Sequence, residues 1–173
     1  MTILRRVEEF CQCAAIGSSD HIAHMKYLIK TDPKKFMLST EDPLHFINTL
    51  NTKGQSALYI AAKNGNAEVI QLLIENNVNH LIKSKVFEII STEYNSFKVY
   101  SNEIYEETAL EVTTRWGHQN IINMLLQHYK FDSKVVKGCL KMASNSNVKY
   151  IIKEYMKKNQ IKSRGFFFAC SKY

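Results

Sequence analysis

The residues whose types and spacing could carry chemistry are two cysteines and two histidines near the start of the chain. Cys11 and Cys13 form a Cys-x-Cys pair, and His21 and His24 form a His-x-x-His pair. Thiolates and imidazoles are common zinc ligands, so a zinc site is one interpretation of this set. In a helix, however, side chains two positions apart point to nearly opposite sides, and both thiols cannot face one metal. We therefore expect structural roles for these residues and no cofactor.

The sequence contains no other arrangement that is typical of an active site. It has no Ser-His-Asp or Cys-His constellation, no glycine-rich phosphate-binding loop and no paired carboxylates on one predicted helix face. The adjacent acids Glu8–Glu9 and Glu106–Glu107 are expected to be solvated. We predict that the chain is not an enzyme and takes no small-molecule substrate.

Composition fits one folded domain or a short solenoid. The chain has 173 residues, of which 45% are hydrophobic, and only six glycines and two prolines. No apolar run approaches the roughly 20 residues that a membrane-spanning helix needs. The four cysteines lack the spacing of a small disulfide scaffold, so we expect a reducing compartment, by default the cytoplasm. Arg5 and Arg6 leave an organelle presequence as an alternative, against which Glu8 and Glu9 argue.

Positive charge is concentrated near the C-terminus. Residues 130–173 contain 11 Lys and Arg against 2 acids, whereas residues 1–129 contain 12 against 14. The net charge of +7 therefore comes from the last quarter of the chain. Such an asymmetry indicates an acidic partner or surface near this end.

The elements that position side chains are clearest between Asn51 and Asn79. Ser56 can cap a first helix, and Gly65 ends it, since a residue without a Cβ adopts positive φ at the lowest cost. A second helix follows after this tight turn. Its apolar stripe has the i, i+3, i+4 spacing and consists of Val69, Leu72 and Leu73.

This stretch resembles an ankyrin repeat, whose pattern is G-x-T-P-L-H-x-A-A-x-x-G-H followed by E-V-V-x-L-L. The chain has G-Q-S-A-L-Y-I-A-A-K-N-G-N and then E-V-I-Q-L-L. Ser56 replaces Thr, Ala57 replaces Pro and Tyr59 replaces His, so the cap is kept and the usual His hydrogen bond is lost. The resemblance implies an all-α repeat solenoid, because one helix pair cannot bury its own stripe.

A second copy lies within residues 105–128. The segment TALEVTTRWGHQNIINMLLQH starts at Thr108, and its landmarks lie 52 positions after those of the first copy. The family unit is about 33 residues, so about 19 extra residues separate the copies. His118 occupies the family's Gly-His position, which implies a hydrogen bond to an adjoining turn.

Two flanking segments have only the apolar spacing of a helix pair. We interpret two segments as degenerate repeats, residues 2–30 and the segment after Phe131–Asp132. In the first of them, Asp20 is the expected cap of the second helix. The sequence thus predicts about four helix pairs in one domain over residues 1–158, followed by a basic tail at 159–173.

The extra residues, about 81–107, are the least family-like part. KVFEIIS and FKVYSNEIY are rich in β-branched and aromatic residues, and Glu93–Ser96 between them can form a turn. We predict an enlarged β-hairpin at the place where ankyrin units carry a short one. The alternative is an irregular loop folded back on the helices.

Ankyrin repeats bind partners through hairpin tips and exposed positions of each first helix. The resemblance therefore implies binding positions at Ile60, Lys63, Asn64, Val112, Arg115 and Trp116. Trp and Arg are enriched in binding hot spots, so Trp116 is the strongest candidate unless the insertion folds over it. In the hairpin the candidates are Phe87, Ile89, Phe97, Val99, Tyr100 and Tyr105, unless core packing takes one face.

The tail contains Arg164 and three consecutive aromatic residues, Phe166, Phe167 and Phe168, without a helical stripe. Exposed apolar patches of this kind mark interaction sites, so we predict that the tail binds a partner. The alternative is that it wraps back over the last helix pair.

Two function classes follow from these observations. The favoured one is a non-enzymatic protein-interaction adaptor or scaffold, a subunit of a larger assembly, whose protein partner has an acidic surface. The alternative is binding of nucleic acid or another anionic surface, with lysines contacting phosphates and the Phe side chains stacking on bases. The lysines are spread over predicted helical turns, as on a solvated face, which argues against the alternative.

Overall fold

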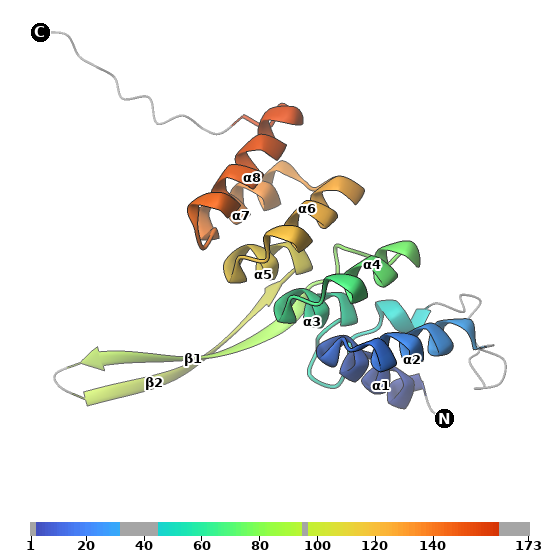
Figure 1. Cartoon of the computed structure of the whole chain (residues 1–173). Helices are drawn as coiled ribbons and strands as arrows, with labels where there is room; N and C mark the ends of the chain where they lie inside the picture. The colour runs from blue at the N-terminus through green and yellow to red at the C-terminus, as the bar shows by residue number, and fades with distance from the viewer. Residues whose placement is uncertain (1–2, 32–44, 95–96, 163–173) are drawn as a thin grey trace, which may run out of the picture.

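The computed structural model describes residues 3–31, 45–94 and 97–162 (Figure 1). The residue patterns that favour helices and strands give a series of helix pairs interrupted by one β-hairpin. The elements are α1 (Ile3–Ile16), α2 (Ser19–Lys30), η2 (His45–Asn48), α3 (Ala57–Asn64), α4 (Ala67–Glu75), β1 (Ser84–Tyr94), β2 (Phe97–Glu107), α5 (Ala109–Trp116), α6 (Gln119–His128), α7 (Ser133–Met142) and α8 (Ser146–Lys158).

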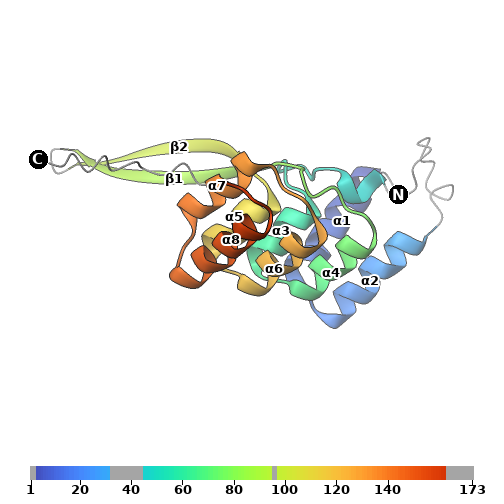
Figure 2. The same cartoon turned by 90° about the horizontal axis from the view of Figure 1, so that it is seen from above.

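The helices stack as two rows, which confirms the predicted all-α repeat architecture with its hairpin. The first helices of the pairs, α1, α3, α5 and α7, contact one another in order, and so do α4, α6 and α8 in the second row. Figures 1 and 2 show the hairpin projecting away from this stack, from between the levels of α3 and α5. The core lies between the rows, because the apolar stripes of all the pairs face inward.

The turn inside each strong repeat has the predicted chemistry. The Ser56 hydroxyl accepts a hydrogen bond from the Tyr59 backbone N–H at 3.2 Å, and Gly65 ends α3 with φ +77°. A Cβ at Gly65 would lie only 3.0 Å from the His118 ring. The His118 Nε2 lies 3.1 Å from the Lys63 carbonyl oxygen, so the predicted contact of His118 with the adjoining repeat is confirmed.

The same contact recurs one repeat earlier with a different residue. Asn66, which lies 52 positions before His118, donates hydrogen bonds from Nδ2 to the carbonyl oxygens of Ala14 and Ala15 at 2.8 and 3.0 Å. Each side chain satisfies carbonyl groups left free at the end of the preceding first helix. The polar residue after the turn glycine therefore links neighbouring repeats.

The N-terminal helix pair differs in detail from its prediction. Helix α2 begins at Ser19 with Ser18 as its N-cap residue, so Asp20 lies in the first turn and is not the cap. Gly17, with φ +68°, ends the turn before α2. Helix α2 therefore begins two residues earlier than a cap at Asp20 predicts. Arg6 is buried in α1, where its guanidinium donates to the Leu28 carbonyl oxygen and lies over the Phe46 ring. This arginine ties α1 to the end of α2 and to η2.

Two buried thiols and a buried phenol predict a loss of stability at high pH. Burial raises the pKa of Cys11, Cys139 and Tyr59 to about 12 each, from ordinary values of 9.0 and 10.0. Folding therefore favours the neutral forms of these side chains. Their contribution to the free energy of unfolding is complete below about pH 9 and is lost as the pH rises towards 12. We expect the free energy of unfolding, measured in urea, to fall across this range. The fall should be shallower in the Cys11→Ala/Cys139→Ala variant, and a curve that stays flat to pH 12 contradicts the prediction.

The insertion is an antiparallel hairpin, as predicted, and not an irregular loop. Its register runs from Ser84 opposite Glu107 to Tyr94 opposite Phe97, with eleven residues in each strand. The predicted turn at Glu93–Ser96 is too long by two residues, because the strands pair through Glu93 and Tyr94. Only residues 95–96, which lie outside the described residues, connect them. The strands are longer than predicted because β pairing continues to Tyr94 near the turn and through Glu106 and Glu107 at the base.

Candidate interaction surface

The base of the hairpin is fixed to the repeat before it. The backbone N–H of Ser56, the cap of α3, donates to the Ser84 hydroxyl at 2.9 Å. One residue further, the Lys85 N–H donates to the Gly54 carbonyl oxygen at 2.8 Å. Ser56 and Ser84 are both buried, so the first of these bonds is shielded from water, whereas Lys85 is exposed. The first strand thus leaves the stack in a direction set by α3.

The base is also fixed to the repeat after it, through Arg115 of α5. The guanidinium donates hydrogen bonds to the Tyr105 hydroxyl and to the Glu107 carboxylate. Glu107 is only 4% exposed, which makes the prediction of a solvated Glu107 wrong. Burial alone lowers the pKa of Arg115, but the bond and charge of Glu107 raise it on balance. Glu107 is buried because β2 must return to the stack to start α5.

The predicted binding positions on the first helices have different environments. Lys63 and Asn64 are exposed at the end of α3, and Ile60 is half-buried. Trp116 is 58% exposed at the end of α5, so the described hairpin does not fold over it. Val112 is fully buried, and its prediction as an exposed position is wrong. Helix α5, which carries Val112, packs between α3 and α7.

The base of the hairpin presents apolar side chains on one face. Phe87 and Ile104 are opposite each other in the register and are 61% and 62% exposed. The next pair towards the stack, Val86 and Tyr105, lies on the other face and is mostly covered. Sequence reasoning named Phe87 but missed Ile104, although the alternation of the strand register could have found it.

The remaining predicted positions are described only in part. The backbones of Phe97 and Tyr100 lie in β2, opposite Tyr94 and Ser91. Arg164, Phe166, Phe167 and Phe168 lie outside the described residues. Their role as a binding tail stays a prediction.

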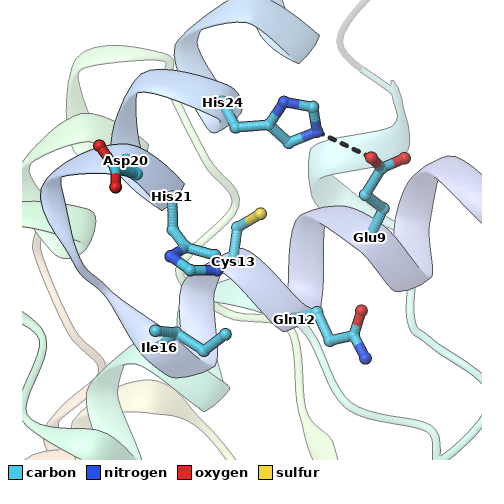
Figure 3. A pocket seen from close by; sticks show the side chains of 7 residues that line it. All are labelled: Glu9, Gln12, Cys13, Ile16, Asp20, His21 and His24. Atoms are coloured by element: carbon cyan, nitrogen blue, oxygen red, sulfur yellow. Dashed lines mark hydrogen bonds and ion pairs between the residues drawn. The ribbon is translucent and has the colours of Figure 1, made fainter.

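Three of the first chemical candidates, Cys13, His21 and His24, line a small depression between α1 and α2 (Figure 3), and Cys11 is not part of its lining. Its volume is about 310 Å³. His24 Nε2 pairs with Glu9 Oε1 at 2.8 Å, and His21 Nδ1 lies 2.6 Å from the Ser18 hydroxyl. Cys11 and Cys13 are buried in α1, and burial raises the pKa of both thiols. Among the described residues, no three potential metal ligands come together.

A family model described as ankyrin repeats, in three copies, matches residues 10–137, from within α1 to within α7. The chain belongs to the ankyrin-repeat family. No curated protein matches the chain. Ankyrin repeats are protein–protein interaction modules and are generally not enzymatic. Within the part of the chain that the structure describes, no helix is long and apolar enough to cross a membrane.

Proposed function

We propose that this ankyrin-repeat protein is an adaptor or scaffold subunit of a larger assembly, and that one protein partner binds at the hairpin base and the neighbouring helix ends. The observation that carries the proposal is the exposed Trp116, which directly follows the arginine that fixes the hairpin. Phe87 and Ile104 add exposed apolar surface at the hairpin base. Large rigid side chains of this kind dominate interface energies when a partner covers them.

The arrangement also keeps the entropic cost of binding a partner low. The hairpin is bonded at its base to α3 through Ser84 and to α5 through Glu107, so a partner need not order it from a loop. Preorganised surfaces lose less conformational entropy on association and bind more tightly for the same contact area. The hairpin therefore enlarges the short tip of an ordinary repeat into an arm whose base is held by both neighbouring repeats.

Affinity purification with the tagged chain at mild salt tests this proposal. We expect Trp116→Ala to reduce the recovery of co-purifying proteins at least about fivefold, since truncating a hot-spot aromatic residue costs about 1–2 kcal/mol or more. Tyr27→Ala is the matched control, because Tyr27 is an equally exposed aromatic residue on α2. Equal recovery with Trp116→Ala and the wild type, or equal losses with both variants, would contradict the proposal. Trp116 is the only Trp, so a blue shift of its fluorescence reports binding of the purified partner.

A further inference from the structure

A groove separates the second helices of the last two repeats and is not part of the hairpin surface. It lies between α6 and α8 and has a volume of about 710 Å³, within the range of ligand-binding clefts. Its lining comes from the end of α6, the linker to α7 and the outer side of α8. The residues that define its chemistry are Leu126, His128, Lys130, Tyr150, Ile151, Glu154, Tyr155 and Lys158.

The floor of the groove is apolar. Leu126 is buried, and Ile151 and Tyr155 are half-buried, so their apolar atoms lie below the surrounding surface. Tyr150 forms part of the wall and is 65% exposed. An aliphatic or aromatic side chain that entered here would bury apolar surface on both partners, which favours association.

The rim of the groove is basic, and so is the surface around it. Lys130 and Lys158 are exposed in the lining, and Glu154 is the only acid there. The surrounding residues 130–162 contain nine lysines and two acids, and most of these lysines are exposed on α7 and α8. A positive field of this size attracts acidic partners and repels basic ones.

We propose that this groove is a second docking site, which takes an acidic segment of a protein partner with an apolar anchor residue. The anchor sits on Leu126 and Ile151, and carboxylates of the segment pair with Lys130 and Lys158. A polar or basic residue of the segment faces Glu154. The chain would thus hold two partners, one at the hairpin and one at this groove on the second helix row.

A nucleic acid fits the groove less well, although tyrosines and lysines occur in both kinds of site. A single strand carries a phosphate at every nucleotide, and Glu154 would repel the phosphate nearest to it. A peptide avoids this repulsion by placing an uncharged residue there. The charges of the groove therefore favour a peptide with spaced carboxylates.

Fluorescence anisotropy with the full chain and a labelled Glu-Glu-Leu-Phe-Glu-Glu-Leu-Leu peptide tests the proposal. We expect Lys130→Glu/Lys158→Glu to raise the Kd at least about tenfold. The matched control is Lys134→Glu/Lys141→Glu, which reverses two exposed charges on α7 outside the groove and should raise the Kd less than about threefold. Tyr150→Ala should weaken binding without lowering the melting temperature, because Tyr150 is exposed.

Three results would overturn the proposal. Equal losses from the two charge-reversal pairs would show binding to the general field and not to the groove. Equal affinity for a peptide whose Leu and Phe are replaced by Ser would show that no anchor enters. Tighter binding of an oligouridylate, lost in the same groove variant, would identify nucleic acid as the ligand. None of these results affects the proposed function, whose surface is Trp116 and the hairpin base.

Discussion

Replacing Leu73 or Leu125 by alanine is expected to lower the free energy of unfolding by about 2–5 kcal/mol in each case. Both side chains are fully buried, one in α4 and one in α6, at equivalent positions of two repeats. These helices contact each other in the second row, and both leucines belong to the buried core of the stack. Truncation removes the transfer free energy of the lost methyl groups and leaves a cavity that the packed helices close only in part.

Urea titrations of the two variants measure this effect against a surface control. Lys157→Ala and Lys158→Ala remove exposed side chains in the last turn of α8 and should change the free energy of unfolding by less than about 0.5 kcal/mol. Because repeats are stabilised mainly by their neighbours, each leucine variant should destabilise the adjacent repeats as well as its own helix pair. Equal effects from the leucine and lysine variants would show that the assumed repeat register is wrong.

The repeat stack could be predicted because its determinants are local. Ser56 and Gly65 set the ends of α3 through a cap and a positive φ, and both signals depend on a few adjacent residues. The apolar spacing in α4 follows from the helical period alone. The same signals at Thr108 and Gly117 fixed the second copy, and the structure adds a full capping box between Thr108 and Glu111.

The environment of single side chains could not be predicted where it depends on distant elements. Glu107 belongs to an acidic pair that looks solvated, yet the return of β2 carries it into contact with Arg115. Val112 occupies a position that is exposed in the family pattern, yet it is fully buried in α5, which packs between α3 and α7. In both cases the deciding neighbour lies in another element, and no local sequence signal reports it.

The groove between α6 and α8 was missed for a related reason. Lys130 and Lys158 are far apart in the sequence and face one cavity only because consecutive repeats stack. The charge count located a basic quarter of the chain but gave no information on its shape. A solvated lysine face can be distinguished from a groove lined by lysines only when the positions of α6 and α8 are known.

Arg115→Ala should be the most damaging change at the hairpin, with a loss of about 2–4 kcal/mol in the free energy of unfolding. Glu107 is almost completely buried and would lose the guanidinium that compensates its charge. The expected loss is smaller than for a fully buried ion pair, because one-third of the Arg115 side chain is exposed to water. Lys63→Ala is the matched control, since Lys63 is exposed at the equivalent position of the preceding repeat and should cost less than about 0.5 kcal/mol.

The double variant Arg115→Ala/Glu107→Gln separates the loss of the ion pair from the loss of packing. Since it removes the buried charge together with its partner, we expect it to be less destabilised than the sum of the single variants, by about 1 kcal/mol or more. Hydrogen exchange gives the local counterpart: amides at the base of the hairpin, at Tyr105–Glu107, should exchange faster in Arg115→Ala, while those of α2 stay protected. Additive free energies, together with unchanged exchange at the hairpin base, would mean that Ser84 and the Gly54 turn alone hold the hairpin against the stack.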